Sequence, residues 1–275
     1  MPELPEIETV CRGLRPVVEN RLLTAVRLFV PALRRPMEAG FAENLSGRRV
    51  LAVSRRAKYM IWTLDDGWSV LFHLGMSGRM VVGDPLKPLL RHDHIVIDTD
   101  EGRRIVFHDP RRFGMAERVE TARLAEHAGL ARLGPEPLDP AFIGAVLAAS
   151  LAGRRTPIKL ALLDQRIVAG LGNIYVSEAL HRAGLSPLRA AGAIGETEAG
   201  ILVDAVKAVL EDAIAAGGSS LRDHRQPSGE LGYFQHAFAV YDQENEPCPR
   251  CGAPKVITRI VQSGRSTYYC RNCQH

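Results

Sequence analysis

Apolar side chains recur at helical spacing near the start of the chain. They lie at positions i, i+3, i+4 and i+7, which are Ile7, Val10, Cys11 and Leu14. Pro5 suits a first helical position, after Leu4 or Glu3, and acidic side chains just beyond it favour the positive end of a helix dipole. The pattern predicts a short helix that buries Cys11 as a packed thiol and holds the N-terminus in a fixed place.

From residue 22 to about residue 118 the pattern changes to short segments rich in β-branched and aromatic residues. Six strands are predicted, at 22–30, 48–54, 58–64, 68–74, 94–98 and 103–108. Turn sequences separate them, such as Asp65-Asp66-Gly67 and Asp100-Glu101-Gly102. Many short strands at this spacing indicate a β-sandwich or a barrel.

The Pro/Gly-rich segment 133–137 marks a change to helical patterns and a domain boundary. Helices are predicted at 141–151, 156–163, 173–183 and 198–216, followed by a Gly/Ser-rich loop at 217–234. We expect Thr156 to cap the second of these helices, with Pro157 at its first position, and Asn173 to cap the third. The fold class is therefore α+β and multidomain, with predicted domains at 1–133, 134–234 and 240–275.

Four of the five cysteines lie near the C-terminus in two CxxC pairs, Cys248 with Cys251 and Cys270 with Cys273. The 18 residues between the pairs are typical of a four-cysteine zinc site. Four thiolates leave no open coordination position, so one structural Zn²⁺ is expected. A hairpin of residues 256–262 and 266–269 should join the pairs, with Arg265 in its turn as either a phosphate ligand or a solvated charge.

The net charge of +4 and the pI near 8.9 are compatible with a polyanionic partner, but they are common in other proteins. No apolar run approaches the length of a membrane span, and acidic residues stand where a signal peptide would be basic. We therefore expect a cytoplasmic protein. Crowded cysteines in such a chain indicate a metal site rather than disulfides.

Pro2 is a candidate nucleophile. A small residue after the initiator predicts removal of Met1, which would leave Pro2 with a free secondary amine beside the Glu3 carboxylate. An α-amino group has a pKa of roughly 7.7–8.0 and is partly unprotonated near neutral pH. By itself, the segment could also be no more than the way the chain begins.

Other candidate residues lie in turns and at predicted helix starts. Lys58 begins an apolar strand, whereas Met76, Arg111 and Phe113 lie in glycine-flanked turns, where they could wedge into a base stack or only pack locally. Phosphate could bind at helix N-termini near Arg154, Lys159 and Asn173, although ordinary caps with solvated charges would give the same pattern. His92 and His94 lack an evident third metal ligand, so a phosphate contact or a core role is favoured for them.

Together these features resemble the formamidopyrimidine-DNA glycosylase family of bacterial enzymes that remove oxidised purines. The resemblance covers the whole chain: PELPE, RRAKY, HLGMSG, DPRRFG, LGPEPL, GLGNIY, GGSSLRD and the four-cysteine finger. It implies a β-sandwich domain, a helix–two-turn–helix domain and a zinc finger. It also implies a monomer that acts on duplex DNA containing oxidised purines or abasic sites, as a bifunctional glycosylase and lyase.

The resemblance also implies residue roles. Pro2 matches the nucleophile that forms a Schiff base at C1′, and Glu3 matches the general acid. Lys58 matches a basic residue that assists catalysis and contacts a phosphate, and Arg265 matches the residue assigned to δ-elimination. The remaining residues are expected to contact DNA or to fill the space of the flipped nucleotide: Met76, His92, Arg111, Phe113, Arg154, Lys159, Asn173 and Tyr241.

Two alternatives stay open. The related endonuclease VIII type, which prefers oxidised pyrimidines, usually has Gly where this chain has Leu4 and lacks a full DPRRFG-like segment. A non-catalytic zinc-finger module would explain the tail but not a proline at position 2 followed by glutamate. The segment 222–227, which includes the polar pair His224-Arg225, puts the preference among lesions in doubt, but not the reaction.

Overall fold

The structure is a computed structural model that describes residues 2–220 and 225–275. The chain forms two compact units. The first contains Met1–Ala131 and Ala216–Tyr233, and the second contains Arg132–Ala215 and Phe234–His275. Residues 216–220 and 225–233 therefore pack with the N-terminal unit, although they follow the longest helix of the second.

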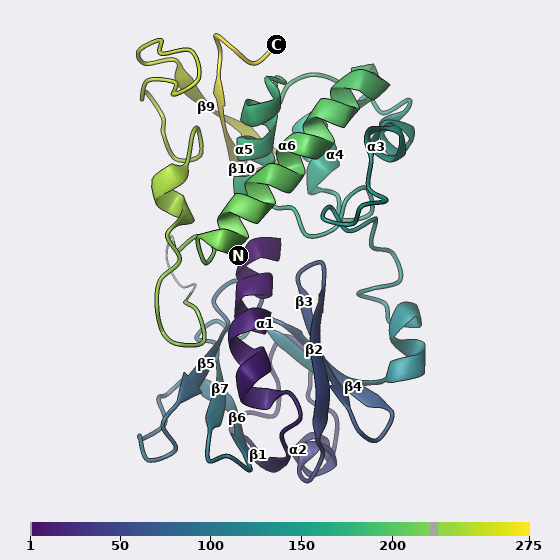
Figure 1. The fold of residues 1–275 in the computed structure, drawn as a ribbon, viewed down its shortest axis with the longest axis vertical. Coiled ribbons are helices and arrows are strands. Elements are labelled where there is room, and N and C mark those ends of the chain that lie inside the picture. The colour runs from purple at the N-terminus through teal and green to yellow at the C-terminus, as the bar shows by residue number, and fades with distance from the viewer. Residues whose placement is uncertain (1, 221–224) are drawn as a thin grey trace. The chain divides into compact units, whose positions relative to one another are not determined.

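The first unit is a β-sandwich of two four-stranded antiparallel sheets (Figure 1). One sheet has the order β1-β6-β7-β5, and the other has the order β2-β3-β4-β8. The strands of the first sheet are β1 (Leu23–Leu28), β6 (Asp93–Thr99), β7 (Arg104–His108) and β5 (Arg79–Gly83). The strands of the second are β2 (Val50–Arg56), β3 (Tyr59–Leu64), β4 (Trp68–His73) and β8 (Met115–Glu120).

Helix α1 (Leu4–Val18) contributes its apolar face to the core of this sandwich. The predicted stripe is buried: Ile7, Val10, Cys11 and Leu14 are each at most 1% exposed. They pack in one cluster with side chains from both sheets, such as Trp62 and Phe107. The short elements α2 (Phe41–Leu45) and η1 (Thr121–Glu126) complete the unit. The core therefore fixes the helix that begins two residues after Pro2.

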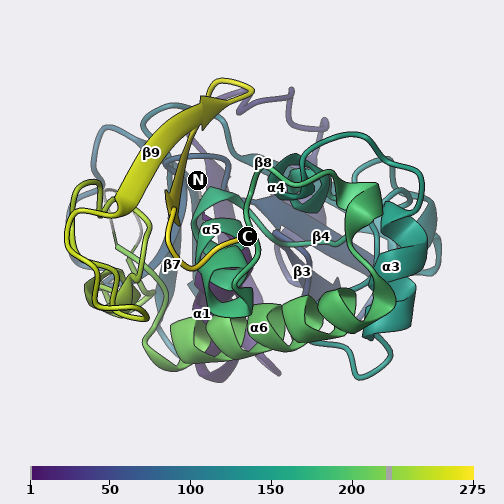
Figure 2. The ribbon, with the colours of Figure 1, turned by 90° about the horizontal axis from the view of Figure 1, so that it is seen from above.

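The second unit is built on helices, which Figure 2 shows most clearly. These are α3 (Gly144–Leu151), α4 (Ile158–Leu163), α5 (Asn173–Ala183), η2 (Ala191–Ala193), α6 (Glu196–Ala215) and η3 (Phe234–Ala237). The long α6 packs against both α3 and α5. Among the described residues, no helix combines the length and apolarity that crossing a membrane requires.

The C-terminal hairpin of β9 (Ile257–Gln262) and β10 (Arg265–Cys270) belongs to this second unit. Ser263 and Gly264 form its turn with φ of 47° and 73°, the left-handed pair of a two-residue hairpin turn. Arg265 is therefore the first residue of β10, paired with Gln262, and not part of the turn as predicted. The side chain of Arg265 is exposed.

The predicted sandwich, helices and hairpin are confirmed, but two strands were missed. Strand β5 lies between two turn-rich segments, and β8 carries Glu117, Arg118 and Glu120, which hide its alternation. The expected helix caps were wrong by one residue: Pro157 caps α4, and Gly172 caps α5 with Asn173 as its first residue. Helix α5 ends at Gly184 as predicted, whereas α3 begins at Gly144 rather than at residue 141, and α6 covers Glu196–Ala215 rather than 198–216. Gly184 and Gly217 both have positive φ.

Replacing Leu14 by Ala should lower the free energy of unfolding by about 2–5 kcal/mol, because Leu14 is fully buried in the sandwich core. Urea denaturation followed by tryptophan fluorescence measures this loss. The control is Leu51→Ala, the same change at a strand residue that is 48% exposed. Equal losses in the two variants would contradict the assignment of α1 to the core.

Candidate functional site

The start of α1 is held by a buried carboxylate. Pro2 is buried, and Glu3 occupies the N-cap position of the helix with extended backbone angles. Glu6 Oε2 accepts a hydrogen bond from Glu3 N at 2.8 Å, and Glu6 Oε1 accepts one from Ser219 N at 2.8 Å. One side chain therefore binds both the segment that carries Pro2 and the segment that follows α6.

Contacts between α1 and β2 set the direction of the helix. They join Glu8 to Arg55 at 3.2 Å, Cys11 Sγ to Ser54 O at 3.6 Å, and Arg15 Nε to Val53 O at 3.0 Å. Residue numbers rise along α1 as they fall along β2, so the two elements run antiparallel. The start of α1, with Pro2 and Glu3, therefore lies towards the end of β2, where the chain turns into Lys58.

The turn between β2 and β3 consists of Ala57 and Lys58, because Arg56 pairs directly with Tyr59. Ala57 has a φ of 53°, as a tight hairpin turn requires. Lys58 is only 6% exposed. The guanidinium of Arg55, which also binds Glu8 on α1, donates to Ala57 O at 3.0 Å. The turn is thus tied to the helix that positions Pro2.

His73 is a residue of this end of the sandwich that the sequence analysis did not single out. Burial, together with the positive charges of Lys58 and Arg34, lowers the pKa of His73 to about 4. Its Nδ1 accepts a hydrogen bond from Gly75 N at 2.9 Å. The ring is therefore neutral near pH 7 and carries its proton on Nε2, where it can donate a hydrogen bond. The HLGMSG motif contained this histidine, but only the fold places it beside Lys58.

The two turns predicted to act as a wedge lie against each other. Asp109 is fully buried, and its carboxylate accepts hydrogen bonds from Ser77 Oγ at 2.6 Å and Gly114 N at 2.8 Å. A Cβ on Gly75 would come within 2.4 Å of Phe113 O, so only glycine permits this approach. The shared carboxylate fixes both turns in one arrangement.

Met76 and Phe113 extend from these turns towards solvent. Met76 is 41% exposed and Phe113 is 44% exposed. The Arg111 guanidinium lies 4.7 Å from the centre of the Phe113 ring. Exposed Met and Phe side chains on rigidly held turns have a shape and polarity that suit insertion into a base stack.

His92 lies beside the wedge turns. Its backbone carbonyl accepts a hydrogen bond from Asp109 N at 3.0 Å, and its ring packs edge-on against His94 and His108. His94 Nε2 donates a hydrogen bond to Asp109 O at 2.9 Å, and burial lowers the pKa of His94. His92 is thus half-buried, and His94 is a buried core residue, one of the roles favoured over a metal pair.

In the second unit, Ser266 O joins the helices to the hairpin. It accepts hydrogen bonds from Asn173 Nδ2 and Lys159 Nζ, both at 2.9 Å. Lys159 Nζ also donates to Thr267 Oγ1 at 2.6 Å, and the lysine is completely buried. This burial is a role the sequence did not indicate: Lys159 holds the finger onto α4. Arg265 is the neighbour of Ser266, so the same contacts position it.

Arg154 and Tyr241 lie elsewhere in this unit. Arg154 is exposed, and its guanidinium donates to Ser150 O at 2.7 Å. Tyr241 packs edge-on against Tyr268 of β10. The buried Glu178 carboxylate on α5 accepts hydrogen bonds from three successive backbone N–H groups, of Ala239, Val240 and Tyr241. Tyr241 is therefore anchored to the helix that begins with Asn173.

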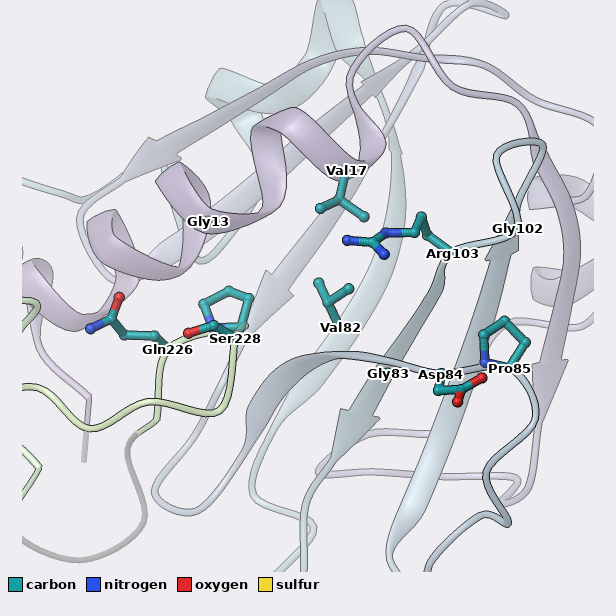
Figure 3. Close-up of a pocket in the computed structure, with 11 residues that line it drawn as sticks. Gly13, Val17, Val82, Gly83, Asp84, Pro85, Gly102, Arg103, Gln226 and Ser228 are labelled. Carbon is teal, nitrogen blue, oxygen red and sulfur yellow. The ribbon is translucent and has the colours of Figure 1, made fainter.

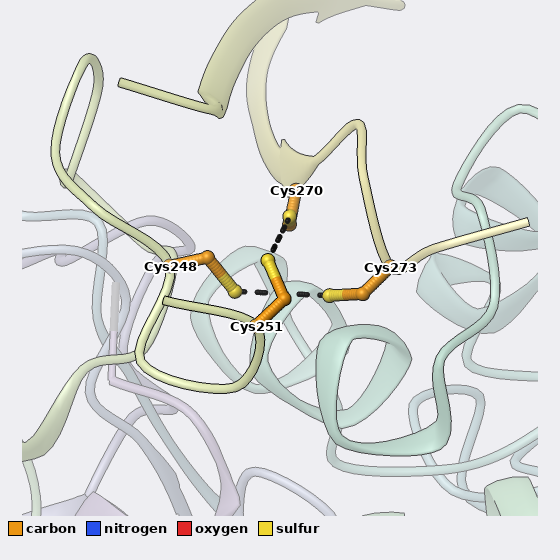
Figure 4. A group of neighbouring side chains, drawn as sticks. All are labelled: Cys248, Cys251, Cys270 and Cys273. Carbon is orange, nitrogen blue, oxygen red and sulfur yellow. Dashed lines mark hydrogen bonds between the residues drawn. The ribbon is translucent and has the colours of Figure 1, made fainter. Parts of the chain in front are cut away.

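The four predicted zinc ligands come together at the base of the hairpin (Figure 4). Their sulfur atoms lie within 4.8 Å of one another, with Cys248–Cys273 and Cys251–Cys270 separations of 3.7 Å. A tetrahedral ion about 2.3 Å from each sulfur would separate the sulfurs by about 3.8 Å, so the donor set fits Zn²⁺.

The surroundings of the cysteines also suit a metal. His181 Nε2 lies 3.3 Å from Cys248 Sγ, which suits a hydrogen bond that orients a thiolate ligand. Burial and the neighbouring sulfurs raise the pKa of Cys273, so this thiol stays protonated near neutral pH when no cation is bound. A bound cation would offset these effects.

Three family profiles match successive parts of the chain. The formamidopyrimidine-DNA glycosylase N-terminal domain matches residues 1–116, and the H2TH domain of the same enzyme matches 133–225. A zinc finger found in FPG and IleRS matches 245–275. The chain belongs to the formamidopyrimidine-DNA glycosylase family.

Individual relatives agree along the whole length. The chain is 56% identical over 282 residues to the formamidopyrimidine-DNA glycosylase of Paracoccus denitrificans and 58% identical over 277 residues to that of Acidiphilium cryptum, with complete coverage of both. The MutM (Fpg) structure from Thermus thermophilus is 43% identical with a TM-score of 0.87, covering 99% of this chain and 98% of that one. Lactococcus lactis Fpg in complex with abasic-site DNA is 32% identical with a TM-score of 0.90, covering 99% of both chains.

Family membership defines the activity class and the metal. The chain is a DNA glycosylase for oxidised purines in base excision repair, and AP lyase activity is general to its family. Its finger holds one zinc ion through the four cysteines. Residues 222–224 of the polar segment 222–227, including His224, lie outside the described residues.

Replacing Cys248 by Ser should abolish stoichiometric zinc binding, because the remaining thiolates cannot complete the tetrahedral site. Zinc content per chain, measured by inductively coupled plasma mass spectrometry, reports the loss. Cys11→Ser is the matched control, since Cys11 lies in the sandwich core and not in the finger. Full zinc content in the Cys248 variant would contradict the assigned ligand set.

The neutral His73 ring should make stability depend on pH. Its pKa in the folded protein is about 4 and its ordinary value is 6.5. The contribution of the neutral His73 ring to the free energy of unfolding is therefore complete above pH 6.5 and is lost as the pH falls towards 4. His73→Asn should reduce the loss of unfolding free energy over this range, measured by urea denaturation, whereas His236→Asn at an exposed site should not. An unchanged pH dependence in the His73 variant would refute the assignment.

Proposed function

We propose that Pro2 is the nucleophile of the glycosylase and lyase reactions once Met1 has been removed. The observation that carries this proposal is the antiparallel docking of α1 on β2, which places the buried Pro2 and Glu3 towards the turn of Lys58. A covalent adduct at the terminal amine needs that amine to be held still, and the hydrogen bond from Glu3 N to Glu6 holds the adjoining backbone.

The reaction would proceed in balanced steps. The Pro2 nitrogen attacks C1′, the C1′–N9 bond breaks, and the oxidised base leaves with a proton. The C1′–O4′ bond then opens as Glu3 protonates O4′, which leaves an iminium between the Pro2 nitrogen and C1′. Loss of a proton from C2′ expels the 3′ phosphate, and a second elimination expels the 5′ phosphate. Water finally hydrolyses the iminium and frees the enzyme.

Two cations would assist these steps. Lys58 is nearly buried and aids catalysis while it contacts a phosphate of the lesion strand. Because its ammonium is largely shielded from water, its attraction to a phosphate would be stronger than that of an exposed lysine. Arg265 is exposed on a zinc-supported hairpin, where its guanidinium can bind a phosphate by two hydrogen bonds and assist δ-elimination.

The wedge residues would offset the cost of flipping the damaged nucleotide. A base cannot be attacked at C1′ while it remains stacked, and flipping costs a few kcal/mol. Met76, Arg111 and Phe113 are presented together on turns fixed by Asp109, so they can fill the vacated space with little loss of their own freedom.

The remaining DNA contacts come from both units. His92 contributes in the first, and Arg154, Asn173 and Tyr241 contribute in the second. Lys159 would act through Ser266 and the finger, because its ammonium is already bound there. We further propose a monomeric protein, a cytoplasmic location at the nucleoid, and the domain division 1–133, 134–234 and 240–275. In this division the loop 217–234 contacts the flipped base.

Borohydride reduction of a reaction with duplex DNA that contains 8-oxoguanine opposite cytosine should trap a covalent adduct at Pro2, since reduction converts the iminium to a stable amine. Peptide mass spectrometry locates the adduct. Pro2→Glu, which retains Met1 because a large residue follows it, should give none.

Pro5→Ala, a proline change inside α1, is the matched control and should still be trapped. An adduct on Lys58 with Pro2 unmodified would show that the nucleophile is wrongly assigned. No adduct and no strand cleavage by the zinc-loaded wild-type protein would defeat the proposed mechanism.

A further inference from the structure

Gly13 stands in the middle of α1, where glycine is an unfavourable residue. Glycine is among the poorest helix formers, so its presence inside a 15-residue helix calls for a packing reason. That reason is Pro227. A Cβ built on Gly13 would lie 2.9 Å from both Pro227 Cδ and Cγ, closer than carbon atoms approach in folded proteins. The missing side chain thus makes room for the proline ring.

Pro227 lies at the tip of a tight turn in the segment 217–233. Gln226 N donates to Glu230 O at 2.9 Å, and Gly229 N donates to Gln226 O at 2.8 Å. Pro227 is buried, and its carbonyl accepts a hydrogen bond from Val82 N at 2.8 Å. Because β5 is the edge strand of its sheet, the turn supplies a partner that this edge would otherwise lack.

The same segment has a second anchor on α1. At its beginning, Ser219 N donates to Glu6 Oε1 at 2.8 Å, and Ser219 forms a bridge with Tyr233. Glu6 and Gly13 are seven residues apart, so they lie on one face of the helix. The helix that begins beside Pro2 therefore contacts residues 217–233 near their start and again at the turn.

A cavity of about 790 Å³ adjoins the turn (Figure 3). It is lined by Gly13 and Val17 of α1, Val82 at the edge of the sheet, Arg103, and Gln226 and Ser228 of the turn. The turn therefore has open space beside it. A side chain at position 13 would displace the turn into this space more readily than it would break the helix.

We infer that Gly13 is a positioning residue: its bare backbone seats the turn at Pro227, so that α1 sets the place of the described residues 217–220 and 225–233 relative to the Pro2 amine. This inference rests on the proposed role of residues 217–233 in contacting the flipped base. Helix α1 then has two roles: it holds the Pro2 nucleophile, and it aligns the segment that contacts the base displaced by Pro2.

Gly13→Ala tests the inference with two substrates. Single-turnover excision of 8-oxoguanine should fall about 10- to 100-fold, the scale of loss that follows a misplacement of about 1 Å. Cleavage of a duplex with a preformed abasic site should be unchanged, because it has no base for residues 217–233 to contact. Gly83→Ala is the matched control: it adds a Cβ beside the same cavity but meets no atom within 4 Å, so both rates should be unchanged.

A second variant separates displacement of the turn from damage to the helix. Pro227→Ala removes Cγ and Cδ and leaves only Cβ, which lies 3.4 Å from the Cβ built on Gly13. The double variant Gly13→Ala/Pro227→Ala should therefore excise 8-oxoguanine faster than Gly13→Ala alone. The melting temperature of Gly13→Ala should not fall, because alanine favours the helix.

The outcomes distinguish failure of the positioning role of Gly13 from failure of the proposed function. If Gly13→Ala excises 8-oxoguanine as fast as Gly83→Ala does, or if it loses both activities equally, the positioning role is overturned while the proposed function stands. If the double variant is no faster than Gly13→Ala, the contact with Pro227 is not the cause and the inference also fails. Wild-type protein that cleaves neither duplex would overturn the proposed function itself, and the inference with it.

Discussion

The two hydrogen bonds that the buried Glu6 carboxylate accepts are the contacts on which the position of the N-terminus most depends. Burying a carboxylate in a protein is costly unless hydrogen bonds replace its water. Here two backbone N–H groups do so, Glu3 N from the start of α1 and Ser219 N from the segment after α6. These donors are 216 residues apart in sequence, so one charge brings together the two segments proposed to bond to the sugar and to contact the base.

The rest of the sandwich supports that contact. The apolar stripe of α1 is buried in the core, and Glu8 and Arg15 fix the helix along β2. Asp109 performs a similar task for the wedge turns, since its carboxylate is satisfied by Ser77 and Gly114. Glu6 and Asp109 are both buried acidic side chains that hold a loop in place by accepting hydrogen bonds from it. The turns held by Asp109 carry the exposed Met76 and Phe113. A rigid support of this kind reduces the entropy that DNA binding must overcome.

The second unit uses a carbonyl and a metal for the same purpose. Ser266 O accepts from Asn173 and Lys159, so the hairpin that carries Arg265 is joined to both α4 and α5. The finger alone has only a small apolar cluster around Val240, Ile257 and Tyr268. Zinc binding therefore supplies much of the energy that keeps its turns folded. The glutamate on α5 that binds residues 239–241 adds a connection that does not depend on the metal.

Local patterns in the sequence determined much of this protein. The stripe of α1, the six strong strands, the glycine-terminated helices and the CxxC pairs were all readable, because they depend on periodicity and on residue chemistry within one segment. Strands β5 and β8 could not be predicted in this way, because neighbouring turn residues and charged side chains conceal the alternation of apolar and polar positions. Only the tertiary structure decided that Lys159 is buried under the finger, that burial together with Lys58 lowers the pKa of His73, and that Gly13 leaves room for Pro227. Each of these depends on which distant segment packs against a residue, and that is a property of the folded chain as a whole.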